Sequence, residues 1–168
     1  LCMEHGSLDY NQAENQTNVA KIYDVDSLLR VNRGSYSNYI RGFEVDCTGL
    51  IIPQIKNLAD AKQIEEFTKF PPIGKRGVDG GNNDGKYTKL NMVDYIKQAN
   101  QERLVIYQIE TPEVIDDVEA IAEMEGVDAL FFGPGDYSLT LGVPGQMDHP
   151  DVVSARKKVA EVARKNNK

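Results

Sequence analysis

Polar and charged side chains follow or interrupt the short apolar runs of this sequence, where buried strands would end. They are Glu4 and His5 after the first run, Arg30 inside the second, Pro53 after the third, Gln108 and Glu110 at the fourth, and Asp136 after the fifth. Ligands bind at the carboxyl ends of the strands in both open and closed parallel α/β sheets. We therefore expect these side chains to meet at one rim.

Two of these residues, Glu110 and Asp136, end neighbouring predicted strands. Carboxylate and water oxygens are ligands of hard divalent cations such as Mg²⁺ and Mn²⁺, so the pair predicts a metal site. Each carboxylate can instead cap the helix that follows it. The segment Gly133-Pro134-Gly135 would also leave backbone N–H groups free for an anion, such as the carboxylate of a keto acid.

Arg30, Gln108 and His5 are three further candidate site residues. Arg30 lies inside an apolar run, where a charge is costly unless paired, so it either pairs with a structural acid or points at a ligand. Gln108 lies two residues before Glu110 and therefore on the same side of the strand. His5 is either a general base or a surface histidine in a turn.

Short apolar runs alternate with segments of helical spacing along the chain. The apolar runs predict strands at 1–3, 27–31, 48–53, 104–110 and 127–132. Amphipathic spacing predicts helices at about 10–23, 36–43, 58–67, 91–100, 112–122 and 150–166. This alternation is typical of an α/β fold with a parallel sheet covered by helices. The pattern leaves open whether the sheet is open or closed into a barrel.

The length bears on that alternative. Five predicted strands are fewer than the eight of a closed (β/α)8 barrel, which typically needs ~250 residues. The sequence has 168 residues, begins without Met inside an apolar run and ends in a Lys/Asn run. No internal repeat or domain linker is visible, so we expect residues 1–168 to be a single domain and part of a longer chain.

The region from Pro71 to Gly85 is rich in Gly, Pro and Asn, which predicts a long loop, either a mobile lid or a disordered connection. Its compact basic pair, Lys75-Arg76, is interpreted as solvated loop charge. Cys2 and Cys47 are too few for a disulfide framework and too widely separated for a paired-cysteine zinc site. They predict reduced, structural thiols.

Composition excludes several classes of protein. With 40% hydrophobic and 27% charged residues, the sequence is that of an ordinary globular protein and not of a disordered one. Nineteen Lys and Arg against 26 Asp and Glu give 19 − 26 = −7, which disfavours nucleic acid and anionic membranes as partners. No apolar stretch approaches the roughly 18 residues of a membrane span, and no signal peptide is visible. We expect a cytoplasmic protein.

Six motifs occur in one order along the chain. They are Met3-Glu4-His5-Gly6, Leu29-Arg30-Val31, Gly49-Leu50-Ile51-Ile52-Pro53, the segment from Phe70 to Gly77, Gln108-Ile109-Glu110-Thr111 and the segment from Gly126 to Ser138. Together they resemble the HpcH/HpaI aldolase family over nearly the whole chain. The pattern is most similar to class II pyruvate aldolases of the 4-hydroxy-2-oxo acid and 2-dehydro-3-deoxyglucarate types.

The resemblance implies a (β/α)8 TIM barrel of the phosphoenolpyruvate/pyruvate-binding type. This sequence would be a partial chain from about the second strand to the sixth helix, without the first strand and the last two β/α units. The resemblance also implies a homo-oligomer built from dimers, including hexamers. The implied cofactor is Mg²⁺ or Mn²⁺, with Co²⁺ as a further candidate, and the implied partner is a small keto acid substrate.

Site roles follow from the matching motif positions. The resemblance implies that Glu110 and Asp136 bind the metal, and that the backbone amides of Gly135 and Asp136 hold the pyruvate carboxylate. It implies that Arg30 binds the pyruvyl oxygen, with Gln108 as the neighbouring glutamine. His5 matches the histidine assigned to acid/base work.

The implied activity is metal-dependent cleavage of a 4-hydroxy-2-oxo acid to pyruvate and an aldehyde, through a metal-stabilised pyruvate enolate. Two alternatives are a citrate lyase beta-like acyl-CoA lyase and a catalytically silent metal- or keto-acid-binding barrel. One departure bears on the choice, because Cys2 stands where many members have an aspartate that partners the histidine. Without that carboxylate, we expect the imidazole to lose an orienting acceptor.

Overall fold

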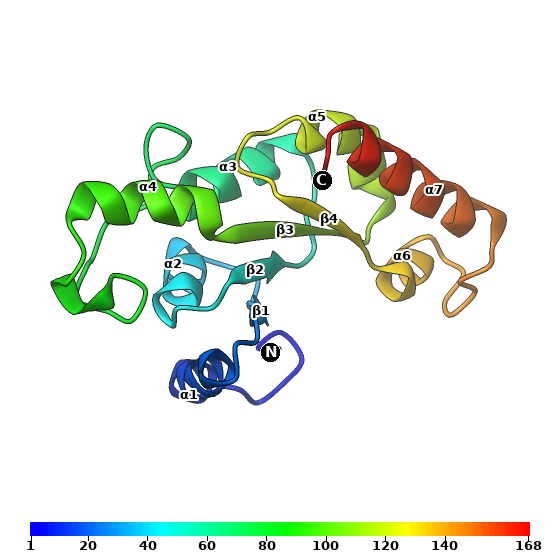
Figure 1. Ribbon diagram of the computed structural model, residues 1–168. Coiled ribbons are helices and arrows are strands. Elements are labelled where there is room, and N and C mark those ends of the chain that lie inside the picture. Colours follow the sequence, from blue (N-terminus) through cyan, green and yellow to red (C-terminus); the bar gives the residue numbers. More distant parts are fainter.

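The computed structural model describes residues 1–168 and consists of four parallel strands alternating with helices (Figure 1). The strands are β1 (Leu28–Arg30), β2 (Gly49–Ile52), β3 (Leu104–Ile109) and β4 (Ala129–Phe132). The α-helices are α1 (Tyr10–Ile22), α2 (Tyr36–Glu44), α3 (Leu58–Thr68), α4 (Met92–Glu102), α5 (Val118–Ala122), α6 (Pro134–Thr140) and α7 (Pro150–Lys165). Two 3₁₀ helices, η1 (Lys86–Thr88) and η2 (Pro112–Asp116), complete the set.

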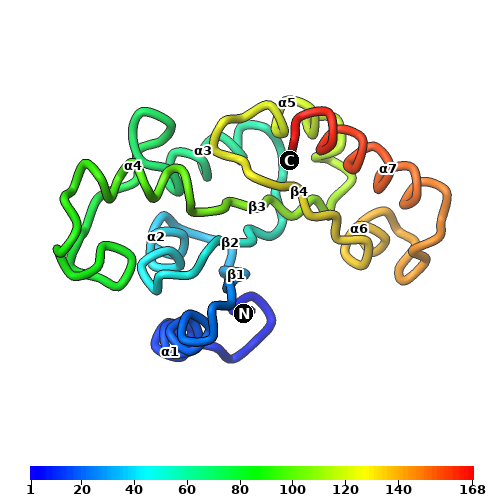
Figure 2. The backbone as a smooth tube through the Cα atoms, viewed as in Figure 1, coloured from blue at the N-terminus to red at the C-terminus, as the bar shows by residue number.

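The strands lie side by side in the order β1-β2-β3-β4, which is also their order in the sequence. A doubly wound open sheet reverses its strand order at one point, whereas this sheet progresses in one direction. Because crossovers between parallel strands are right-handed, a sheet that progresses in one direction places its crossover helices on one side. Figure 2 shows α2, α3 and α5 along the same outer side of the curving strands. The topology is that of a segment of barrel wall, and the α/β fold class is confirmed.

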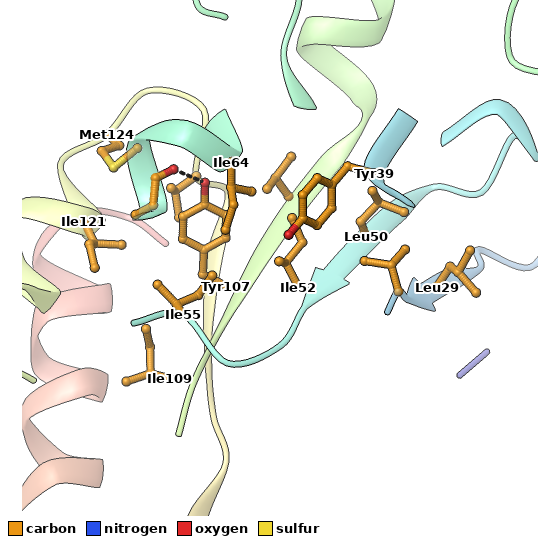
Figure 3. Close-up of a cluster of buried hydrophobic side chains, with 14 of the residues drawn as sticks. Leu29, Tyr39, Leu50, Ile52, Ile55, Ile64, Tyr107, Ile109, Ile121 and Met124 are labelled. Carbon is orange, nitrogen blue, oxygen red and sulfur yellow. Dashed lines mark hydrogen bonds between the residues drawn. The ribbon is translucent and has the colours of Figure 1, made fainter. Parts of the chain in front are cut away.

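The hydrophobic core lies between the outer side of the sheet and the helices. Alternate strand residues are fully buried there: Leu29, Leu50, Ile52, Val105, Tyr107 and Ile109. They pack against residues of the covering helices, and the Tyr107 hydroxyl donates to the Ala61 carbonyl at 2.8 Å (Figure 3). The intervening strand residues face the other, inner side, where the register aligns Arg30, Ile51, Ile106 and Ala129 in one row.

Local sequence signals explain where the helices begin. The Asp9 side chain accepts from the Gln12 N–H at 2.8 Å while the Gln12 side chain accepts from the Asp9 N–H, so a capping box opens α1. The Asn57 side chain caps α3, and Pro150 opens α7, the longest helix at 16 residues. None of the helices combines the length and apolar composition that a bilayer crossing requires.

The structure corrects two predicted elements and adds one helix, α6. The expected strand at 1–3 is a single parallel bridge between Cys2 and Arg30, formed by backbone hydrogen bonds from the Met3 N–H to the Arg30 carbonyl and from the Arg30 N–H to the Leu1 carbonyl. The expected helix at 112–122 is divided into η2 and α5, with Pro112 in the first turn of η2. Helix α6 follows β4 directly, in a segment for which the sequence pattern predicted no element, and Pro134 at its first position suits a helix start.

The loop between α3 and α4 carries one exposed and one buried basic side chain. Lys75 is exposed as predicted, with its side chain 73% accessible, but the side chain of Arg76 is only 2% accessible. The Arg76 guanidinium lies between the rings of Phe43 and Phe70, 4.9 and 4.5 Å from their centroids, and donates to Asp84 at 2.9 Å. The interpretation of Arg76 as solvent-facing was therefore wrong, because its partner comes from the far end of the same loop.

Candidate functional site

Glu110 follows β3 at the rim, and its side chain is buried with both oxygens engaged. The residue is 1% exposed. Its Oε1 accepts from the backbone N–H of Gln54 at 2.6 Å, and its Oε2 accepts from the Gln108 amide. Gln54 lies two residues after the end of β2 and adopts a left-handed φ of 54°. The structure thus brings Gln108 and Glu110 together, as their spacing predicted.

The electrostatic surroundings of Glu110 favour its protonated form. Burial raises the pKa of the Glu110 carboxyl, and the negative charges of Asp136 and Glu4 raise it further. The hydrogen bonds from Gln54 and Gln108 oppose this rise without cancelling it. Two further carboxylates therefore act on Glu110 at this rim, an arrangement that a bound cation would stabilise.

Gly133, the residue directly after β4, makes room for these side chains. A Cβ at this position would lie 2.8 Å from Glu110 Oε2 and 3.2 Å from Gln108 Nε2. In the sequence, Gly133 lies between an apolar run and a proline and belongs to the segment expected to offer backbone N–H groups to an anion, with no sign of a contact to Glu110. Only the register of β4 on β3 sets the glycine against the glutamate.

A Gly133→Ala substitution is expected to lower activity without unfolding the protein. The φ of Gly133 is −100°, which alanine adopts freely, so the effect would come from the displaced side chains of Glu110 and Gln108, since the new Cβ would also lie 2.9 Å from Glu110 Cβ. We expect a fall in activity of about 10- to 100-fold, the usual effect of moving a group that orients a metal ligand. Turnover measured beside thermal unfolding tests this, with Gly80→Ala in the loop between α3 and α4 as control, because a Cβ there comes no closer than 3.7 Å to another atom. Equal turnover in the two variants would contradict the prediction.

Arg30 ends β1 and is held by two side chains from the N-terminal segment. Its Nε lies 3.2 Å from Glu4 Oε2, and its Nε and Nη2 donate to Cys2 Sγ at 3.3 and 3.1 Å. The hydrogen bond to Cys2 raises the pKa of Arg30, burial opposes the rise, and the charges of Glu4 and Glu110 add to it. Glu4 is a further site residue that the sequence analysis left without a role.

His5 is the least constrained of the predicted site residues. Its side chain is 63% exposed, and its Nε2 lies 3.7 Å from Glu4 Oε2. The imidazole makes no hydrogen bond, and the Cys2 side chain turns to Arg30 instead. The structure therefore places His5 at the rim without an orienting acceptor.

Asp136 and Gly135 lie in the first turn of α6, at the end of β4. Both residues are exposed. The backbone N–H groups of a first helical turn have no carbonyl partner within the helix, so they are available to an anion. The charge of Asp136 acts on Glu110. The two predicted metal ligands therefore belong to one rim, where neighbouring strands end.

The side chains at this rim suit a hard divalent cation. No group of three or more His, Cys, Asp or Glu side chains has the spacing of a metal site, and the carboxylates that would bind a metal here are the predicted pair Glu110 and Asp136. The buried Gln108 Oε1 has no hydrogen-bond partner, which adds an unsatisfied oxygen beside Glu110. Oxygen donors of this kind fit Mg²⁺ or Mn²⁺, with the remaining ligands from water and substrate.

Comparison with known proteins gives one family. The model of the HpcH/HpaI aldolase/citrate lyase family matches residues 3–168. A pyruvate aldolase of Rhizobium etli is 33% identical over 152 residues, covering 90% of this chain and 59% of the relative. A 2-keto-3-deoxy-L-rhamnonate aldolase of Salmonella gallinarum is 29% identical over 150 residues, covering 89% and 55%. The chain thus spans somewhat more than half the length of these curated relatives.

The fold is also similar to solved structures. An HpcH/HpaI aldolase/citrate lyase family protein of Burkholderia cenocepacia superposes with a TM-score of 0.90 and 30% identity, over 99% of this chain and 66% of the other. The similarity covers the strands and the helices that position Arg30, Gln108 and Glu110. The strands and helices that carry the rim residues therefore have the same fold in both proteins.

Proposed function

The chain belongs to the HpcH/HpaI aldolase/citrate lyase family, and on that premise we propose that the protein is a metal-dependent carbon–carbon lyase. It cleaves a 4-hydroxy-2-oxo acid to pyruvate and an aldehyde. The observation that carries the proposal is the juxtaposition of Arg30 with Glu4, and of Gln108 with Glu110, at the carboxyl ends of β1 and β3. The relatives named as pyruvate and 2-keto-3-deoxy-L-rhamnonate aldolases support this class of substrate.

Each residue has a role that its surroundings support. Glu110 and Asp136 would hold the divalent ion, which when bound would supply Lewis-acid stabilisation of negative charge on the keto oxygen. Arg30 donates to the same developing charge from the β1 side. The first-turn amides of Gly135 and Asp136 receive the substrate carboxylate. His5 accepts the proton of the 4-hydroxyl group, and its exposure calls for a water between imidazole and substrate.

The test is release of pyruvate from 4-hydroxy-2-oxo acids of several chain lengths, followed by a coupled assay. We expect release with Mg²⁺ or Mn²⁺, loss of release on treatment with EDTA, and recovery on addition of metal. Co²⁺ is included as a third ion. Release that persists undiminished in EDTA would contradict the metal-dependent mechanism.

The family description also names citrate lyases, so an acyl-CoA lyase is the second candidate. Cleavage of a 3-hydroxyacyl-CoA thioester in place of a 4-hydroxy-2-oxo acid would identify this branch. The exposed His5 without an acceptor motivates the third reading, a silent binder of metal and keto acid. Metal-dependent pyruvate binding without turnover of either substrate class would identify it.

Partners and location follow from the same proposal. We propose a homo-oligomer built from dimers that acts on small keto acids in the cytoplasm. The net charge of −7 supports the proposal that neither nucleic acid nor membrane is a partner. Light scattering after gel filtration measures the oligomeric state, and a monomer at micromolar concentration would contradict it.

A further inference from the structure

Cys2 touches the guanidinium of Arg30 along one edge. Its sulfur accepts from Nε at 3.3 Å and from Nη2 at 3.1 Å, while Nη1 donates to no protein atom. A guanidinium is planar with its donors in a fixed fork, so engaging Nε and Nη2 together sets the plane and direction of the remaining N–H groups. Together with Glu4 Oε2, which lies 3.2 Å from the same Nε, the contact therefore sets where the free edge of Arg30 points, and Cys2 is the partner of Nη2.

The backbone holds the two residues in register. The Met3 N–H donates to the Arg30 carbonyl at 2.8 Å, and the Arg30 N–H donates to the Leu1 carbonyl at 3.0 Å. These bonds form the parallel bridge between Cys2 and Arg30. In a parallel pair, opposed residues project to the same face, so Cys2 and Arg30 share the inner side of the sheet.

The two cysteines of the chain have opposite electrostatic surroundings. Burial raises the pKa of the Cys2 thiol, but N–H groups of His5 and Glu4 and the Arg30 guanidinium outweigh it, so the net pKa is lowered. Cys47 is fully buried, and burial raises its pKa to about 12. Only the sulfur beside Arg30 is therefore placed to act as a charged acceptor.

We propose that Cys2 is a positioning residue for the lyase reaction, because its sulfur orients the Arg30 guanidinium toward the substrate. The inference rests on the proposed function for its consequence in catalysis, but the contact can be tested without turnover. It assigns a role to the residue that replaces the expected aspartate. The side chain at this position serves Arg30 on β1 and not the imidazole of His5.

The first test is alkylation of the native protein with iodoacetamide, followed by mass spectrometry. We expect Cys2 to be labelled at pH 7 and Cys47 to stay unlabelled until the protein is denatured, so Cys47 is an internal control. In Arg30→Met, the labelling rate of Cys2 at pH 7 should fall by about tenfold, since the neighbouring positive charge is lost. Arg30→Lys keeps the positive charge but not the paired N–H donors of the guanidinium, so the Cys2 labelling rate should fall less. This variant also keeps the test valid if Arg30→Met does not fold.

The second test is kinetic. Cys2→Ala is expected to lower kcat by about tenfold, the effect of losing one charge-assisted hydrogen-bond acceptor, with a smaller change in KM. Cys2→Asp should restore most of kcat, because a carboxylate accepts from the same two nitrogens. A purely structural role of the thiol would not give rescue by this charged substitution.

The outcomes separate this inference from the proposed function. Wild-type kcat in Cys2→Ala, or a Cys2 labelling rate unchanged in both Arg30 variants, overturns the positioning role. Arg30-dependent labelling in a protein that cleaves no substrate supports the contact and rejects the lyase function instead. Arg30-dependent labelling together with loss in Cys2→Ala and rescue in Cys2→Asp supports both.

Discussion

An Arg30→Ala variant is expected to lose kcat by about 10²–10³-fold, the effect of removing one preorganised donor to a developing oxyanion. KM should rise far less, because the enolate charge that Arg30 stabilises exists mainly in and after the transition state. The position supports this assignment, since Arg30 lies on the inner side of β1 and its pKa is raised by Cys2 and by the charges of Glu4 and Glu110.

Steady-state pyruvate release measures both parameters. Arg41→Ala is the matched control, because Arg41 is an exposed arginine of α2 that stacks on Tyr10 and does not face the rim. We expect the control to keep wild-type kcat and KM. An Arg30→Ala variant that also kept wild-type kcat would remove Arg30 from the mechanism.

An Asp84→Ala variant is expected to be destabilised by about 3–5 kcal/mol, the cost of leaving a buried charge without its partner. The Asp84 side chain is 1% exposed. It accepts from Arg76 at 2.9 Å, from Arg103 at 2.8 Å and from the Tyr95 hydroxyl at 2.7 Å. Removing the carboxylate would leave the buried Arg76 guanidinium with Tyr95 and two aromatic rings as its remaining contacts.

Chemical denaturation of Asp84→Ala, compared with wild type and with a control variant, measures this loss of free energy of unfolding. Glu66→Ala is the matched control, because Glu66 pairs with the adjacent Lys75 at 2.6 Å on the surface, with side chains 46% and 73% exposed. An exposed pair contributes only about 0–1 kcal/mol, so the control should unfold near the wild-type midpoint. Equal midpoints for Asp84→Ala and Glu66→Ala would show that the buried network does not stabilise the fold.

The fold was predictable wherever local periodicity and chain order were sufficient. Apolar runs located all four strands to within two residues, and amphipathic spacing located α1 to α4 and α7. Elements that depend on one or two turns were less well predicted, because α5 and α6 have only five and seven residues. A helix of one or two turns has too few residues for an amphipathic stripe to identify it.

Some residues of the candidate site were predictable from the sequence, and others were not. Gln108 and Glu110 could be assigned to one face because the strand period is two, and the ordered motifs supplied the family. Their roles as ligands of a keto acid and of a metal remain predictions that the experiments above test. Glu4 and Gly133 needed the structure, because each acts on a residue far away in the sequence.

The sequence by itself determined the alternation of strands and helices, the polar residues that end the strands, and the family. Only the tertiary structure decided that Cys2 contacts Arg30, that Gly133 leaves room for Glu110, and that Arg76 is buried against Asp84. The physical reason is the distance along the chain over which each interaction acts. Backbone periodicity and capping act within a few residues, whereas the environment of a charge depends on which distant segments the register of the sheet and the packing of the loops bring beside it.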